Sequence, residues 1–429
     1  MQAAPAQSRK HMIAAVLSII FFDSLGAGLI IPALPGLLET FSGTGPAQVS
    51  LTYGGIISLY SVGLFIASPL LGQLSDRFGR KPIFIVTLTG AMVDYAIMAS
   101  FSSVVALAVG RLLAGICGAN FPTASAYLTD ILPPERRDHG FGWVGAAFGL
   151  GFIVGPVVGG LMAGLGLRAP FWGAAGLAAA NALFSLLVLR ESRVRPGGRL
   201  EVEPEAYPGT RLPRGGLNPL APLLRLFSDR QFQPLLAALL LYHLAMLMIQ
   251  SIWVLFTQVR FGWTAAQVGL SLTVFGLMAA VVQGGLVGPV LGRLGGRAGL
   301  LIGLAVSVAG CLLYGLATAG WQLYAVLVVA SLGWLVPPAI QSLASRGVEA
   351  EAQGMLQGGL MASYGGASAV APVISTAVFT WADGERHPGA VFFLASALVA
   401  VAFMIVAQRR PDGALEGATD AVTARPRGG

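Results

Sequence analysis

Apolar runs of about twenty residues recur along nearly the whole chain, from Met12 to Ala407, with short polar breaks between them. A helix rises about 1.5 Å per residue, so each run is long enough to cross the roughly 30 Å hydrocarbon core of a bilayer. We count twelve such runs. Since 55% of the residues are hydrophobic and only 10% are charged, a soluble domain of this length would lack polar surface. The sequence therefore predicts an all-α membrane protein with twelve transmembrane helices.

Basic residues gather in alternate connections between these runs, whereas the other connections hold little more than Arg168, Arg260 and Arg386. This asymmetry is the positive-inside pattern, and it predicts a multi-pass membrane protein with both termini cytoplasmic. It also explains the net charge of +7 without a nucleic-acid partner. The basic connections contain Arg9, Lys10, Arg77, Arg80, Lys81, Arg136, Arg137, Arg293, Arg297, Arg346, Arg409 and Arg410.

The first run continues past Asp23 to Ile31 without a small-residue cleavage site, so we interpret it as an uncleaved helix rather than a signal peptide. Cys117 and Cys311 both lie inside apolar runs, where they predict packing rather than a disulfide or a metal cluster. We expect no cofactor and no metal site. An intramembrane enzyme is not predicted either, because no run offers a nucleophile with a base or a set of metal ligands.

The chain repeats itself between its two halves. One set of matches, at an offset of 220, places Arg77 and Gly79 opposite Arg297 and Gly299. A second set, at an offset of 216, begins with Pro122 opposite Pro338 and also includes Glu135 with Glu351, Gly142 with Gly358 and Pro156 with Pro372. Two parallel halves of six helices are the layout in which a solute binds near the membrane midplane while the halves rock against each other.

The repeat and the Pro/Gly-rich polar stretch between the halves predict four regions. Residues 1–190 form a first six-helix bundle, 191–231 a cytoplasmic linker, 232–408 a second six-helix bundle, and 409–429 a disordered cytoplasmic tail.

Three ionisable residues lie well inside the runs of the first half: Asp23, Asp94 and Arg111. Each costs about 2.5–3.5 kcal/mol near a helix centre, so each requires an explanation. Asp94 and Arg111 are about equally far from the turn that joins their helices, which predicts similar depth and a possible ion pair. Such a pair could be purely structural, or the carboxylate could bind and release a proton. For Asp23, in a small-residue segment, we expect proton or cation binding.

In the second half, His243 and Gln250 could contact a solute, although His243 could equally be an interhelical hydrogen-bond donor. The basic turn between the second and third runs contains Asp76, Arg77, Gly79 and Arg80. Its basic residues provide a topology signal, but topology does not explain Asp76. We therefore expect a conformational latch in which Asp76 faces a helix N-terminus or an arginine.

The fifth run contains a segment of glycines around a proline, which predicts a bent helix with a flat face for close packing on a partner helix. The segment comprises Gly151, Gly155, Pro156, Gly159 and Gly160.

Taken together, these motifs resemble the major facilitator superfamily, and within it the tetracycline-type drug/proton antiporters. The resemblance runs nearly end to end and implies the two-bundle major facilitator fold. It includes residues 23–35, 75–82, 91–95, 110–115, 148–160, 253–256, 260–263 and 353–358.

The resemblance implies that Asp76 and Arg80 gate the cytoplasmic side, that Asp130 belongs to the same gate, and that Arg111 assists proton transfer. It also implies that Asp23 and Asp94 face the pathway of a cationic or metal-chelated drug. Ala279 and Ser307 stand where tetracycline exporters have a histidine and an aspartate, so the family's usual proton route is altered here.

We therefore predict proton-coupled efflux of a drug-like amphipathic compound, with tetracycline as one candidate substrate, and with multidrug or antibiotic resistance as the consequence. The expected partners are the small-molecule substrate, protons and membrane lipid, and the expected state is a monomer. By the same resemblance, the expected location is the bacterial inner (plasma) membrane. The alternatives are a solute importer or facilitator on the same fold and a sensor without transport.

Overall fold

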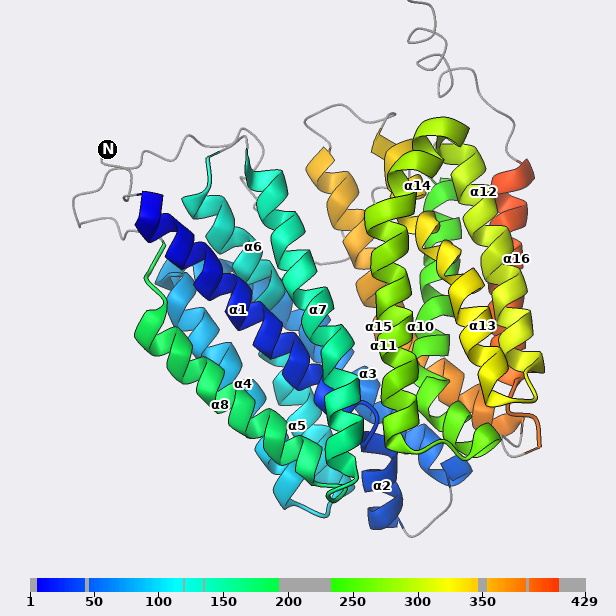
Figure 1. The fold of residues 1–429 in the computed structure, drawn as a ribbon, viewed down its shortest axis with the longest axis horizontal. Coiled ribbons are helices and arrows are strands. Elements are labelled where there is room, and N and C mark those ends of the chain that lie inside the picture. The colour runs from blue at the N-terminus through cyan, green and yellow to red at the C-terminus, as the bar shows by residue number, and fades with distance from the viewer. Residues whose placement is uncertain are drawn as a thin grey trace, which may run out of the picture.

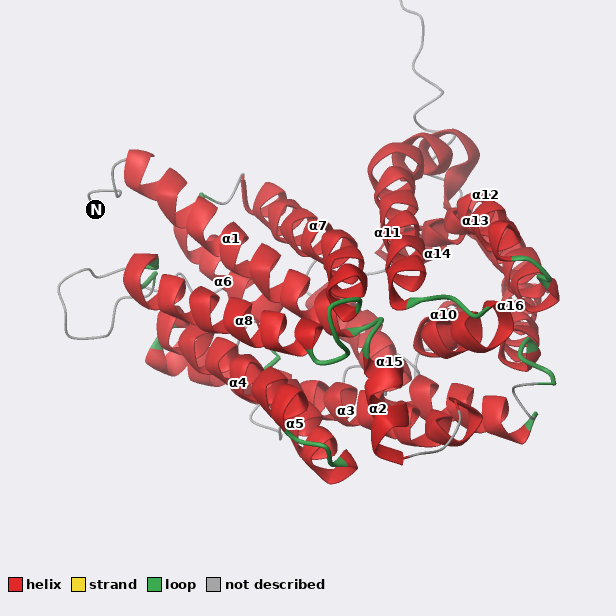
Figure 2. Cartoon of the chain, turned by 60° about the horizontal axis from the view of Figure 1, so that its bottom comes forward, coloured by secondary structure: helices red, strands yellow, loops and turns green. Residues whose placement is uncertain are grey.

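The computed structural model describes residues 6–42, 46–118, 120–133, 136–192, 233–345, 353–382 and 386–408. Over these residues the chain consists of helices joined by short turns, without a strand, and the helices form two side-by-side groups (Figures 1 and 2). The predicted all-α membrane fold is confirmed. Most of the predicted linker and the whole predicted tail, residues 409–429, lie outside the described residues.

The first group begins with α1 and ends with α8 (Figure 1). Its helices are α1 (Ala6–Ile30), α2 (Leu34–Ser42), α3 (Pro46–Phe78), α4 (Arg80–Ser100), α5 (Val104–Ile116), α6 (Asn120–Ile131), α7 (Arg137–Ala163) and α8 (Ala169–Val188). The second group contains α10 (Gln233–Phe261), α11 (Ala265–Val281), the π-helix η2 (Val282–Leu286), α12 (Val287–Leu316), α13 (Gly320–Ala330), the 3₁₀-helix η3 (Ser331–Leu335), α14 (Val336–Ser345), α15 (Gln353–Trp381) and α16 (Ala390–Gln408).

Eleven helical stretches among the described residues are long and apolar enough to cross a membrane. One of them, Ala265–Leu316, has 52 residues, which at about 1.5 Å per residue is more than twice the length that a bilayer core requires. Gly295 interrupts this stretch with a non-helical backbone. The stretch is therefore two spans joined by a tight turn, and the described chain has the twelve spans that the apolar runs predict.

The same turn occurs in both halves. Gly79 ends α3 with φ 103° and ψ 164°, and Gly295 has φ 82° and ψ 162°. Positive φ is a region that favours glycine, so both turns depend on a residue without a Cβ. The two glycines are 216 positions apart, the offset of the second set of repeat matches. The match of Gly79 with Gly299 at 220 residues is therefore wrong, because Gly299 lies buried inside α12.

The two ends of the molecule differ in charge. The end at which α1 begins and α16 finishes also has the two glycine turns and most of the basic residues, and we call it the basic end. The opposite end, which we call the α2 end, includes the turns between α7 and α8 and between α10 and α11 (Figure 1).

Apolar packing joins the halves at the α2 end. One buried cluster there contains Leu37 and Phe171 of the first half together with Phe256, Phe379 and Phe392 of the second. Toward the basic end the cores are separate. One is confined to the first half, around Phe84 and Tyr127, and another to the second half, around Leu300 and Ile340.

Two helix pairs form most of the contact between the halves. Helix α3 packs on α15, where the Ser50 and Thr380 hydroxyls lie 2.6 Å apart. Helix α7 packs on α11, where the Thr273 hydroxyl donates to the Ile153 carbonyl at 2.5 Å. Toward the basic end, a Cβ placed on Gly145 of α7 or on Gly285 of η2 would meet no atom within 4 Å. Because a shared apolar cluster joins the halves at the α2 end and separate clusters lie toward the basic end, this conformation is closed at the α2 end and parted at the basic end.

Candidate functional site

Asp94 on α4 and Arg111 on α5 form a buried ion pair, as their predicted depth allowed. The Arg111 Nε donates to Asp94 Oδ1 at 3.2 Å. Gly110 leaves the necessary room, because a Cβ at this position would lie 2.7 Å from Asp94 Oδ1. The Asp94 side chain is 0% exposed. Its expected place on the solute pathway therefore stays a prediction, which requires another conformation.

Asp23 on α1 is half-buried and accepts a hydrogen bond from the side chain of Asn120, at the start of α6. The Asn120 amide oxygen in turn accepts from the Thr87 hydroxyl on α4. An amide can donate to a carboxylate and accept from a hydroxyl at the same time. This chain of polar groups links α1, α6 and α4 and holds the Asp23 carboxylate in place.

Aromatic rings surround the buried arginine. The Arg111 guanidinium lies 5.7 Å from the ring centroid of Tyr60 and 5.6 Å from that of Tyr95, distances at which cation–π attraction operates. The Tyr60 hydroxyl feels the charges of both Asp23 and Arg111, and it also interacts electrostatically with Tyr364 of α15 in the other half. We call this group the central cluster; it comprises Asp23, Tyr60, Tyr95, Arg111, Asn120 and Tyr364.

The second half meets the central cluster through Tyr364 and its neighbours. The His243 ring on α10 lies edge-on to Tyr364, with centroids 5.4 Å apart and planes at 89°. Gln250, two turns along α10, is exposed. At the altered family positions, Ala279 is buried in α11, and the buried Ser307 hydroxyl donates to the Gly303 carbonyl at 2.7 Å.

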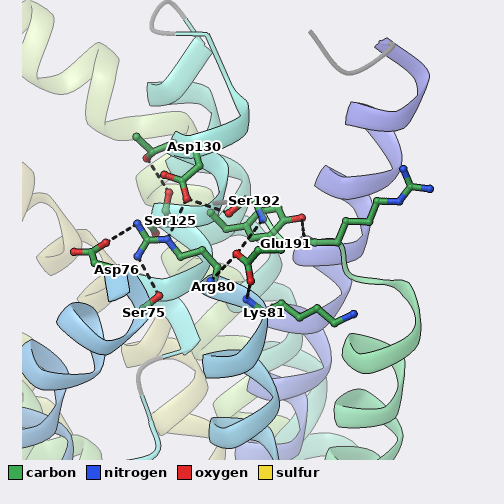
Figure 3. A network of polar contacts seen from close by, with 11 residues as sticks. Ser75, Asp76, Arg80, Lys81, Ser125, Asp130, Glu191 and Ser192 are labelled. Carbon is green, nitrogen blue, oxygen red and sulfur yellow. Dashed lines mark hydrogen bonds and ion pairs between the residues drawn. The ribbon is translucent and has the colours of Figure 1, made fainter. Parts of the chain in front are cut away.

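Arg80 is the centre of an ionic network at the basic end (Figure 3). It pairs with Asp76, four residues earlier, at 2.9 Å and with Asp130 of α6 at 3.1 Å, and it donates to the Ser75 hydroxyl at 3.0 Å. We call these residues the latch. Asp76 thus faces an arginine, one of the two arrangements that the sequence predicted for it.

Glu191, directly after α8, is a residue of this region that sequence reasoning missed. Its carboxylate accepts from the backbone N–H groups of Arg80 at 2.8 Å and Lys81 at 3.1 Å, and so caps α4 (Figure 3). An anion at a helix N-terminus is stabilised by the unpaired N–H groups and the helix dipole. Ser192 adds a bond to Asp130 at 3.0 Å. The first residues of the predicted linker therefore belong to the latch.

Gly79 is required at the latch for two reasons. Its φ of 103° favours glycine, and a Cβ there would lie 2.7 Å from the Glu191 carboxyl carbon. Arg77 lies on the exposed side, with its guanidinium 5.4 Å from the Phe78 ring centroid.

The glycine face of α7 packs against α1. Helix α1 is therefore the partner helix that the glycines of the fifth run predicted. A Cβ on Gly155 would lie 2.8 Å from the Gly28 Cα, and one on Gly151 or Gly159 would also meet α1 backbone. Gly160 faces the other half instead, where a Cβ would lie 2.8 Å from the Ala266 Cα of α11. The helix continues through Pro156. This segment of α7 therefore lies between its own bundle and the opposite one.

Two signals could have located the missed residues. An acidic residue directly after a predicted helix, next to a basic turn, is a candidate cap, and this describes Glu191. A polar amide in an apolar run needs a partner, and this describes Asn120. The tyrosines of the central cluster give no such signal, because aromatic side chains are ordinary components of membrane helices. Among the described residues, no group of three or more His, Cys, Asp or Glu lies close enough to hold a metal ion.

The comparisons with known proteins agree with this architecture. A family model described as "Major Facilitator Superfamily" matches residues 16–285 and 235–425. Tetracycline resistance protein, class E, from Escherichia coli is 37% identical over 391 residues, covering 91% of this chain and 93% of that protein. The class C protein from the same organism is 35% identical over 390 residues, covering 90% and 94% respectively.

Among solved structures, the human organic anion transporter MFSD10 (TETRAN) is similar with a TM-score of 0.67 and 26% identity, over 94% of this chain and 100% of that one. Two parallel six-helix bundles with a charged cluster at their junction define a solute transporter that works between two bundles. The chain belongs to the major facilitator superfamily.

Proposed function

We propose that this protein is a proton-coupled antiporter of the bacterial inner membrane that exports a drug-like amphipathic compound, with tetracycline among the candidate substrates. The relatives named as tetracycline resistance proteins support the class of substrate. The proposal includes cytoplasmic termini, so that the basic end faces the cytoplasm in accordance with the positive-inside rule. It also takes the monomer as the transporting unit.

The observation that best supports this function is the central cluster at the junction of the halves. Arg111 is paired with Asp94, so the carboxylate of Asp23 in this cluster is not neutralised by Arg111. Asn120 holds the Asp23 carboxylate in place by a hydrogen bond. An intramembrane carboxylate beside a solute path can be neutralised by a proton or by a cationic group of a substrate. The two ligands would then compete for the same site, which is the requirement for exchange.

The free energy of one proton is sufficient for useful export. A proton crossing 100 mV yields about 2.3 kcal/mol, and each unit of pH gradient adds about 1.4 kcal/mol. Since about 1.4 kcal/mol corresponds to a tenfold ratio, together they would support a substrate gradient of several hundred-fold.

The test is substrate accumulation in inverted vesicles under an imposed pH gradient, with tetracycline as the first probe and a resistance panel in a pump-deficient host for other compounds. We expect Asp23→Asn to eliminate accumulation, and Asp94→Asn to do the same while sparing downhill exchange. Ser307→Ala is the control and should accumulate substrate normally. Accumulation in both asparagine variants, or its loss in the control alone, would contradict the proposed proton route. Flux in the opposite direction would indicate an importer.

The latch has a separate role in the proposal, as the gate of the basic end. Charge reversal in Asp76→Lys should abolish transport while leaving membrane insertion intact, because the turn keeps its positive charge and Arg80 loses a partner. Gly292→Lys is the matched control, since Gly292 lies 216 positions further on and a Cβ there would meet nothing within 4 Å. Near-normal flux in Asp76→Lys would remove the gating role.

A further inference from the structure

The second half brings few ionisable groups to the membrane interior. Its described residues, from 233 to 408 with their gaps, include no Asp, Glu or Lys. Its described arginines and one of its two histidines lie near the ends of the spans or in turns: Arg260, Arg293, Arg297, Arg386 and His387. His243, in the eleventh position of the 29-residue helix α10, lies well inside a span.

Two neighbouring residues of α15 hold the His243 ring. The Ser363 hydroxyl lies 3.4 Å from Nδ1, and the Tyr364 ring lies edge-on to the imidazole at 5.4 Å. Tyr242, the preceding residue, is turned elsewhere, because its hydroxyl donates to the Gly333 carbonyl at 2.7 Å. The imidazole is therefore oriented toward α15, the helix that contacts the first half through α3.

Tyr364 continues this arrangement across the junction. Its side chain is 48% exposed, and it interacts electrostatically with the Tyr60 hydroxyl, which also feels the Asp23 charge. Asp23, Tyr60, Tyr364 and His243 thus form a line of polar groups from α1 through α3 and α15 to α10. A carboxylate stands at one end of the line and an imidazole at the other.

We propose that His243 is the proton-accepting group of the second half and that Tyr364 and Ser363 are its positioning residues. This inference rests on the proposed antiport. A neutral imidazole takes up one proton on a ring nitrogen to form an imidazolium, and it later releases the same proton to the cytoplasm, so no other bond is made or broken. An imidazole can be neutral or cationic, as a group that loads and unloads a proton during each cycle must be.

Among the described residues, no charged side chain acts directly on His243. The titratable groups that face it are Tyr364 from α15 and Tyr242 from its own helix, with Tyr60 of α3 and Cys311 of α12 beyond them. Helices α11, α14 and α16 contribute no ionisable side chain. In the proposal, the proton that His243 accepts is therefore not replaced by a neighbouring basic side chain of the described second half.

The experiment compares wild type, His243→Gln and the control His387→Gln in inverted vesicles. At an imposed gradient of one pH unit, losing one coupled proton lowers accumulation about tenfold. We expect this loss in His243→Gln, with downhill exchange preserved and with a weaker dependence of that exchange on pH than in wild type. We expect Tyr364→Phe and Ser363→Ala to shift that pH dependence without abolishing exchange.

Three results would overturn the inference: wild-type accumulation in His243→Gln, an unchanged pH profile, or loss of downhill exchange together with accumulation, which would indicate a substrate contact. If wild-type vesicles themselves fail to accumulate substrate, the proposed function fails instead. Should His243→Gln not fold, a variant with His11, His139 and His387 replaced by Gln keeps His243 as its one histidine. NMR of its ring protons should show a titration that substrate shifts, and a ring that does not titrate contradicts the proposal.

Discussion

The two glycine turns at the basic end have nearly the same backbone and very different surroundings. Gly79 and Gly295 share positive φ and a ψ near 160°, and each is followed two residues later by a basic side chain that donates to a carbonyl near the end of its bundle's last helix. In the part of the chain that the structure describes, acidic side chains surround the first turn alone: Asp76, Asp130 and Glu191.

This comparison extends to the membrane interior. The first half has a buried ion pair and a second carboxylate, whereas the described second half has aromatic rings, hydroxyls and one histidine. The repeated fold thus fixes backbone geometry in both halves, while the described acidic side chains are confined to the first half.

The largest effect should come from breaking the buried ion pair of the first half. Removing one partner of such a pair costs about 3–5 kcal/mol, because the other charge is left buried alone. Asp94→Asn should therefore lower the melting temperature of the purified protein strongly. Arg111→Lys should impair transport severely with less destabilisation, since a guanidinium and an ammonium make different contacts.

The double variant Asp94→Leu/Arg111→Leu separates stability from function. An apolar pair of similar volume can replace a buried ion pair without loss of stability, so the melting temperature should recover while transport should not. If Arg111→Lys transports as well as wild type, Arg111 is a simple counter-charge and the ion pair is structural.

A smaller effect should come from overpacking the contact between α7 and α1 in the first half. In Gly159→Val the new side chain would meet the Leu29 backbone, with Cβ 2.6 Å from its carbonyl carbon. Overpacking of this kind costs about 1–3 kcal/mol. The control on the same helix is Gly149→Val, where a Cβ would meet no atom within 4 Å. Equal thermal destabilisation of the two variants would contradict the described contact between α7 and α1.

The two turns can be compared directly by Gly79→Ala and Gly295→Ala. Each forces a side chain into a glycine-favoured backbone region, at about 1–3 kcal/mol. Gly79→Ala should cost more, because its Cβ would collide with Glu191, whereas a Cβ on Gly295 would meet nothing within 4 Å. In a Glu191→Ala background the excess should disappear. A double-mutant cycle on melting curves measures this coupling, and a cycle with zero coupling would remove Glu191 from the latch.

The smallest effect should come from the two basic residues that the turns share. Lys81 donates to the Leu186 carbonyl at 2.7 Å, and Arg297 donates to the Ala407 carbonyl at 3.4 Å. Contacts of exposed cations with helix C-termini contribute about 0.3–1 kcal/mol and weaken with salt. Lys81→Gln and Arg297→Gln should each lower stability by no more than this. A large loss in either variant would show that these residues do more than cap a helix.

Much of the architecture was predictable from the chain alone, because the bilayer requires a minimum length of every span and makes every buried charge unfavourable in free energy. The apolar runs predicted the twelve spans, and the depth of Asp94 and Arg111 predicted their pairing. The repeat was predicted too, but its offset at the basic turn was wrong. At this turn, the identities of Leu, Gly and Arg residues match at an offset of 220, whereas the backbone angles of the two turns match at an offset of 216. Because glycine is so frequent in this chain, residue identities alone could not decide between the two offsets.

The sequence by itself determined that this chain lies in a membrane, that it forms two related bundles, and which carboxylates and arginine need an explanation there. Those conclusions follow from hydration and Born energies, which depend on residue type and on position along a helix. Only the tertiary structure decided that Asn120 holds Asp23, that Glu191 caps α4, and that Tyr364 joins His243 to the first half. These contacts connect helices far apart in sequence, and the rotation of each helix about its axis is set by packing against its neighbours.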